Sequence, residues 1–153
     1  MPQAVSKRVS DSFTTQVQIL TQGNMNGYQR LFGGQLMSWM DIVAGVAARR
    51  HSGRNVTTVR VESLDFHAPA YANDTLVLTA NVCYVGRTSM DICVKVYVEA
   101  LSGERKLINE AHFIMVALDD NERPTVVPSL LLETEEERQA WAEAEKRRTI
   151  RNT

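Results

Sequence analysis

The sequence predicts a single α+β domain, built from one long apolar helix and about five antiparallel strands. Three observations carry this prediction. Residues 34–51 have apolar side chains at helical spacing. Five other stretches have the composition or the two-residue alternation of strands, and short turns join most of them, which favours antiparallel pairing. The chain of 153 residues is long enough for one core and too short for two ordinary domains, so we assign residues 1–153 to one domain.

The first predicted strand, residues 11–20, leads into a loop rich in Gly, Asn and Gln and then into the helix. The helix has apolar residues around most of its circumference, and Gln35, Ser38 and Asp41 form one thin polar stripe. A helix that is apolar on nearly all sides must be buried on nearly all sides. We therefore expect this helix to occupy the centre of the domain.

Four more strands and a second helix follow. The alternation slips near Ser63, which suggests a bulge. Thr134 and Glu137 have capping-box spacing and begin a mostly charged helix in the tail 132–149, with Trp141 as its only large apolar residue. We expect that helix to be solvated and held loosely by Trp141. The four predicted strands cover residues 56–66, 75–85, 90–100 and 106–118.

Such a domain has more apolar surface than one chain can cover. A single sheet covers one side of the helix unless it curls strongly around it, and an uncovered sheet edge is a site for association. We therefore expect a dimer or a larger oligomer, joined through a sheet edge or the flank of the helix.

Composition excludes several classes of protein. No apolar run approaches the ~20 residues of a membrane-spanning helix, and the first residues contain no apolar export signal, so we expect a cytoplasmic protein without membrane contact. Residues 21–60 contain five arginines and one acid, which favours an anionic ligand, but few aromatic residues are interleaved and nucleic acid is not indicated. Cys83 and Cys93 are typical reduced core thiols, and three scattered histidines give no metal site: His51, His67 and His112.

The start of the long helix carries the first candidate site. Gly33 and Gly34 stand where first-turn N–H groups lack helical partners, so they could bind a developing oxyanion, or they could simply allow a tight turn. Asp41 lies seven residues beyond Gly34, about 10 Å along the axis at ~1.5 Å per residue. Asp41 could be a catalytic carboxylate or a polar residue bonded to a neighbouring strand. A site that uses both the helix start and Asp41 needs a second, antiparallel copy of the helix.

Three motifs resemble the hotdog-fold acyl-CoA thioesterases, in particular the cytosolic acyl-CoA hydrolases. They are "NGYQRLFGGQLMSWMDIVAGVAARRH", "SLDFHAP" and "YVGRTSM", in the right order over residues 12–120. The resemblance implies a curved sheet wrapped around one central helix, a homodimer as the minimal unit and, in many members, a trimer of dimers. The resemblance also implies an acyl-CoA substrate and no cofactor, since CoA is part of substrate and product.

The resemblance also implies site residues. Asn26 matches the family's loop asparagine, seven residues before Gly33, and Asn24 fits that spacing less well; Asp41 matches the catalytic aspartate of the opposite subunit. The residues expected to contact CoA are those of the "GRTS" turn: Gly86, Arg87, Thr88 and Ser89. Four further arginines are candidates for the CoA phosphates: Arg30, Arg49, Arg50 and Arg54.

The implied reaction is hydrolysis of an acyl-CoA thioester to a carboxylic acid and CoA. Asp41 would act as general base or as nucleophile, and we favour the general base. A hotdog hydratase is disfavoured because its histidine position is Val46 here. A non-catalytic acyl-CoA-binding module and a thioesterase for acyl carrier protein stay open as alternatives. The sequence does not define the preferred acyl chain.

Overall fold

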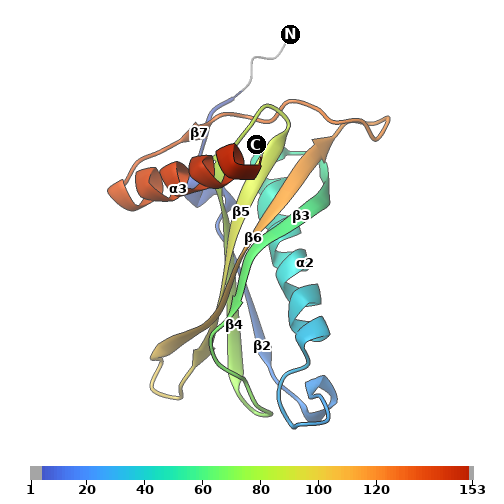
Figure 1. Cartoon of the computed structure of the whole chain (residues 1–153), viewed down its shortest axis with the longest axis vertical. Coiled ribbons are helices and arrows are strands. Elements are labelled where there is room, and N and C mark those ends of the chain that lie inside the picture. The colour runs from blue at the N-terminus through green and yellow to red at the C-terminus, as the bar shows by residue number, and fades with distance from the viewer. Residues whose placement is uncertain (1–4, 152–153) are drawn as a thin grey trace.

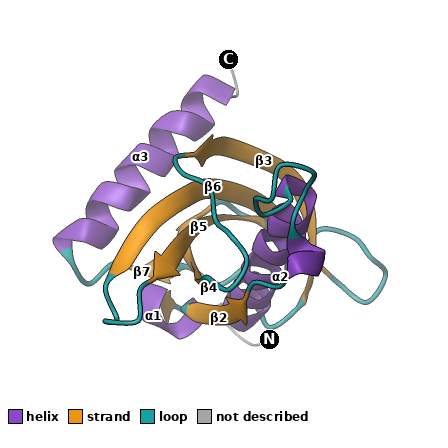
Figure 2. Cartoon of the chain, turned by 90° about the horizontal axis from the view of Figure 1, so that it is seen from below, coloured by secondary structure: helices purple, strands orange, loops and turns teal. Residues whose placement is uncertain are grey.

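The computed structural model describes residues 5–151 and confirms the predicted fold class. Five antiparallel strands in the order β2-β4-β5-β6-β3 curve around one long helix, α2 (Gly33–Ser52) (Figure 1). Figure 2 shows the curvature from below, with the C-terminal helix α3 (Glu135–Arg151) along the outer side of the sheet. The five strands are β2 (Thr14–Ile19), β3 (Asn55–Phe66), β4 (Thr75–Val85), β5 (Ser89–Glu99) and β6 (Arg105–Leu118).

The hydrophobic core lies between α2 and the concave face of the sheet. The alternation in β5 places Ile92, Val94 and Val96 on that face, where none is exposed. Leu36 and Met40 of α2 belong to the same cluster. The predicted strand 75–85 is confirmed as β4, and its hairpin partner runs one residue earlier than expected, from 89 to 99.

The expected burial of α2 on nearly all sides is wrong for the single chain. Met40, Val43 and Ala47 are buried, whereas Asp41 is exposed and Ile42 on the same flank is 54% exposed. The sheet covers one side of the helix only, so the apolar residues of the other flank face outward. Asp41 is therefore accessible rather than enclosed by its own chain.

The N-terminal segment differs from its prediction. The strand expected over residues 11–20 begins only at Thr14, because Val9–Ser12 forms the short helix α1. The Ser12 hydroxyl accepts the Val82 amide at 2.9 Å and so fixes this helix to β4. Two further short elements escaped prediction: β1 (Lys7–Arg8) pairs in parallel with β7 (Leu130–Leu131), and Gln22–Asn24 form one turn of 3-10 helix, η1.

Strand β3 forms one edge of the sheet over 12 residues. Its side chains are mostly exposed, including Val59 at 57% and Phe66 at 58%. The irregularity predicted near Ser63 is confirmed: Ser63 has φ of 52°, and the pairing register with β6 shifts there. A long edge with exposed apolar residues is a surface for association. None of the helices among residues 5–151 is long and apolar enough to cross a bilayer.

Candidate active site

Asp41 is held by a hydrogen bond from the neighbouring strand. The Thr58 hydroxyl of β3 donates to Asp41 Oδ1 at 2.7 Å. Both side chains line a cavity of about 280 Å³, together with Arg49. The bond fixes one carboxylate oxygen and leaves the other available to a ligand or to water. Thr58 was missed from the sequence, because a threonine in an exposed strand carries no distinguishing pattern.

The start of α2 offers free backbone donors. Its N-cap residue, Phe32, provides no capping side chain, so the first-turn amides have no side-chain acceptor from it. A Cβ atom at Gly34 would lie 2.6 Å from the Phe32 ring, so a side chain there would displace that exposed ring. A Cβ atom at Gly33 would have nothing within 4 Å. The open side of Gly33 therefore gives a ligand room to approach the backbone.

Asn26 organises the loop that precedes α2. Its Oδ1 accepts the Tyr28 amide at 2.8 Å and the Arg30 amide at 3.3 Å, and its own amide donates to the Arg30 carbonyl at 2.7 Å. Its Nδ2 has no acceptor among the described residues. The side chain can therefore donate a hydrogen bond to an acceptor such as a carbonyl oxygen.

The structure brings Asn26 together with Gly33, but it does not bring them to Asp41 of the same chain. Asn26 and Gly33 line a cavity of about 320 Å³ at the N-terminal end of α2. This cavity and the one beside Asp41 and Thr58 share no lining residue among those described. One chain thus presents two separate groups of candidate residues.

The turn from Gly86 to Ser89 lies at the other end of the sheet, near the C-terminal end of α2 (Figure 1). The Gly86 amide donates to the Ser89 carbonyl at 2.9 Å. A Cβ atom at Gly86 would lie 2.1 Å from Arg148 Nη1 of α3 and 2.7 Å from the Ser89 hydroxyl oxygen, so a side chain there would displace the end of Arg148. Arg87 is exposed and Thr88 is half-buried. Within one chain this turn is far from Gly33.

The candidate arginines divide by their surroundings. Arg50 is used inside the fold, since its Nη1 donates to the Phe13 carbonyl at 3.1 Å and to the Thr14 hydroxyl at 3.2 Å. Arg49 lines the cavity beside Asp41, and Arg30 lines the cavity beside Asn26. Arg49 and Arg30 therefore stay candidates for contacts with an anionic ligand.

A second polar cluster lies on the outer face of the sheet, beneath α3. The buried Asp91 carboxylate lies 2.9 Å from His112 Nδ1 and 3.2 Å from Arg147 Nη2. The Cys83 thiol donates to the Asp91 backbone carbonyl at 3.4 Å. The Trp141 ring packs on Tyr84 with centroids 4.2 Å apart. The helix α3 is therefore fixed by an ion-pair network as well as by the expected Trp141 contact.

This cluster joins residues that looked scattered in the sequence. Cys83, Asp91 and His112 place their ligand-type atoms within 4.8 Å of one another. Arg147 Nη2 lies 3.2 Å from Asp91 Oδ2, so a guanidinium already supplies a positive charge to this carboxylate. Burial raises the pKa of the Cys83 thiol, and the Asp91 carboxylate raises it further. We interpret the cluster as an anchor that holds α3 on the sheet, and not as a second ligand-binding site.

We expect the anchor to contribute to stability in a pH-dependent way. Burial by itself raises the pKa of Asp91, but the bonds and charges of His112 and Arg147 outweigh it and lower that pKa. A lowered carboxylate pKa stabilises the fold above the unfolded pKa of about 3.9, and that stability is lost as the pH falls through the folded value. Asp91→Asn should cost about 3 kcal/mol of unfolding free energy near pH 7.

The measurement is a series of thermal melts of wild type and Asp91→Asn between about pH 3 and pH 7. The difference in Tm between wild type and Asp91→Asn should become smaller toward pH 3, because Asp91 becomes protonated there. Asp120→Asn, at an exposed turn position, is the matched control and should show no such trend. A constant difference for Asp91→Asn across the range would show that the charge of Asp91 does not stabilise the fold.

The fold and the two groups of residues define a hotdog-type thioesterase domain. Residues 28–102 match the family model described as the thioesterase superfamily. A Bacillus subtilis relative, the uncharacterized acyl-CoA thioester hydrolase YkhA, is 42% identical over 113 residues, which are 73% of this chain and 66% of that protein. An uncharacterized acyl-CoA thioester hydrolase of Zymomonas mobilis is 38% identical and matches over 73% of this chain and 76% of its own length. The chain belongs to the acyl-CoA thioester hydrolases of the thioesterase superfamily.

Solved structures agree over nearly the whole chain. A hexameric acyl-CoA thioesterase, solved in its apo form, superposes with a TM-score of 0.93 at 34% identity, over 97% of this chain and 96% of that one. The acyl-CoA hydrolase of Staphylococcus aureus, solved with butyryl-CoA and CoA, superposes with a TM-score of 0.91 at 29% identity. The match covers 96% of this chain and 90% of that one. Alanine variants of that hydrolase were solved at an asparagine, an aspartate and a threonine. Their spacing along that chain equals the spacing of Asn26, Asp41 and Thr58 here.

Proposed function

We propose that this protein hydrolyses acyl-CoA thioesters to a free carboxylic acid and CoA, in a site assembled from two chains. The observation that carries the proposal is the pairing of Asp41 with Thr58 at 2.7 Å, in a cavity separate from the one lined by Asn26 and Gly33. An oriented carboxylate supplies a base, and a free helix terminus with an amide side chain supplies oxyanion donors. Each half is incomplete without the other.

A second, antiparallel copy of the chain would complete the site. Asp41 stands about 10 Å along α2 from Gly34 at ~1.5 Å per residue, too far for one helix to serve one carbonyl with both. The exposed edge strand β3 and the exposed Ile42 flank of α2 provide the surface for a partner. We propose a homodimer as the minimal unit and a trimer of dimers as the full assembly, in keeping with the hexameric relative.

In the proposed mechanism, Asp41 takes a proton from a water molecule, and the resulting hydroxide attacks the thioester carbonyl carbon. The Thr58 hydroxyl fixes the orientation of the carboxylate. Negative charge develops on the carbonyl oxygen, where the partner's first-turn amides at Gly33 and Gly34 and the Asn26 Nδ2 would donate hydrogen bonds. The C–S bond then breaks, and the CoA thiolate leaves and gains a proton. Water is the only co-reactant.

The CoA moiety would leave the site toward the turn that follows β4. In an antiparallel dimer, the turn of one chain and the Gly33 end of the other would fall on the same side. The exposed Arg87 and the Arg49 beside Asp41 then offer guanidinium groups to phosphate, and Ser89 offers a hydroxyl. The Staphylococcus aureus hydrolase was solved with CoA bound, which supports CoA as the moiety to be accommodated.

The activity is tested by incubating the purified protein with acyl-CoA substrates of several chain lengths and detecting the released CoA with a thiol reagent. We expect hydrolysis of at least part of the series. The same assay with an acyl group on acyl carrier protein separates the two carriers. Binding of acyl-CoA without release of thiol would identify a non-catalytic module instead.

Thr58 provides a prediction for the orientation of Asp41. Thr58→Val keeps the size of the side chain and removes the donor to the carboxylate. A hydrogen bond to a charged group contributes about 1.5–3 kcal/mol, so we expect kcat to fall by about 10- to 100-fold with little change in KM. Thr58→Ser retains the hydroxyl and is the control that should stay close to wild type. Equal kcat for the valine and serine variants would remove Thr58 from the mechanism.

A further inference from the structure

Strand β6 has one residue more than β5 between Leu107 and Asn109, and the extra residue is Ile108. The Ile108 carbonyl accepts the His67 amide at 2.8 Å and lies 3.4 Å from the Ala68 amide, which ties the segment after β3 to this bulge. Ile108 is only 2% exposed. The bulge therefore turns its side chain inward, beside the loop that follows β3.

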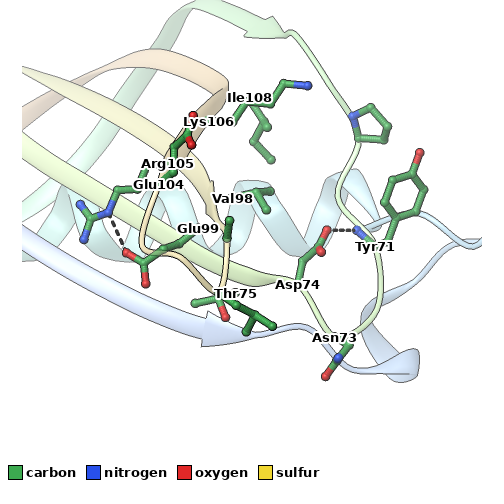
Figure 3. A pocket seen from close by; sticks show the side chains of 13 residues that line it. Tyr71, Asn73, Asp74, Thr75, Val98, Glu99, Glu104, Arg105, Lys106 and Ile108 are labelled. Atoms are coloured by element: carbon green, nitrogen blue, oxygen red, sulfur yellow. Dashed lines mark hydrogen bonds and ion pairs between the residues drawn. The ribbon is translucent and has the colours of Figure 1, made fainter.

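Ile108 stands between two cavities. The first, of about 320 Å³, is the one lined by Asn26 and Gly33. The second, of about 590 Å³, lies beyond Ile108 near the turn between β5 and β6; Figure 3 shows its labelled lining residues, Val98 among them. Among the described residues, only Ile108 and Pro69 line both cavities. These two residues therefore lie where the two spaces adjoin.

We propose that Ile108 determines the length of the acyl chain that this enzyme accepts, by closing the end of the acyl pocket. The inference rests on the proposed function, in which the thioester carbonyl sits beside Asn26 and Gly33. From there the 320 Å³ cavity continues along apolar side chains, including Leu36 and Phe66, to Ile108. An acyl chain bound in this direction ends against the Ile108 side chain.

The volume indicates which acyl groups fit this cavity. At ~30 Å³ for a water-sized group, 320 Å³ holds about ten non-hydrogen groups with the thioester included, so we assign acyl groups of up to about eight carbons as substrates. A longer chain would have to displace Ile108. The space behind Ile108 is large enough to receive such a chain, and its lining includes Val98 and the ion pair of Glu99 with Arg105.

The test compares kcat/KM over saturated acyl-CoA substrates from C4 to C16. In wild type we expect a decline beyond about C8. Ile108→Ala should join the two cavities and raise the C14-to-C6 ratio of kcat/KM by at least about 10-fold. Ile108→Phe should move the decline to shorter chains. Val98→Ala is the matched control, because it deletes an apolar side chain that lines only the larger cavity.

The C14-to-C6 ratio of kcat/KM is measured within one variant and does not depend on the fraction of folded protein. Partial unfolding of a variant therefore does not obscure the result. If Ile108→Ala does not fold, Ile108→Val and Ile108→Phe should still shift the decline in opposite directions. An unchanged ratio in all folded Ile108 variants, or an equal shift in Val98→Ala, overturns the inference while the proposed function stands. A wild-type protein that hydrolyses no acyl-CoA overturns the proposed function, and the inference with it.

Discussion

Asp41→Asn should lower kcat for acyl-CoA hydrolysis by at least about 100-fold, the loss typical of removing a general base. The asparagine keeps the shape of the side chain and can still accept the Thr58 hydrogen bond. Asp41 is exposed in the single chain, so the substitution removes no core packing. We therefore expect unchanged folding and an unchanged oligomer.

The measurement combines the thiol-release assay with size-exclusion chromatography and a thermal melt. Asp120→Asn, at an exposed turn position, is a control that removes the same charge without touching Thr58. It should retain wild-type turnover. Near-normal turnover in Asp41→Asn would contradict the assignment of the base.

Mixing two inactive variants should restore activity. Asn26→Ala removes the amide donor of one half-site, and Asp41→Ala removes the carboxylate of the other. Under conditions that exchange subunits, half of the dimers in an equal mixture combine both variants, and each such dimer has one intact site of two. The expected recovery is about one quarter of the wild-type activity.

Exchange is verified by pull-down of differently tagged chains. A mixture of Asp41→Ala with Asp41→Asn is the control, since no combination of those chains restores a carboxylate. Verified exchange without recovery would mean that Asn26 and Asp41 serve different functions or act within one chain.

Local periodicity was enough to predict the central elements. The alternation of β5 and the short turn before it defined the hairpin, and the apolar run from Gly34 defined α2. The short elements α1, β1 and β7 escaped because two to four residues carry no period. The burial of α2 was overestimated, because periodicity counts apolar residues and does not say which of them a partner chain must cover.

The candidate site was predictable only in part. Asp41 stood out as an acid within an apolar helix, and the glycine pair marked the helix start. Thr58 did not stand out in the sequence. Its role depends on the packing of β3 against α2, which brings the Thr58 hydroxyl 2.7 Å from Asp41 Oδ1. The network of Cys83, Asp91 and His112 depends in the same way on three adjacent strands, whose register is a long-range property.

The free edge of β3 has a consequence for biosynthesis. The single folded chain exposes 12 residues of edge strand, with Val59 and Phe66 among the exposed side chains. Until pairing occurs, that edge is also a template for unspecific strand addition. In the proposed dimer, productive assembly and aggregation would compete for the same backbone groups. Slow expression at low temperature, which keeps the concentration of incomplete chains low, should therefore raise the soluble yield of this protein.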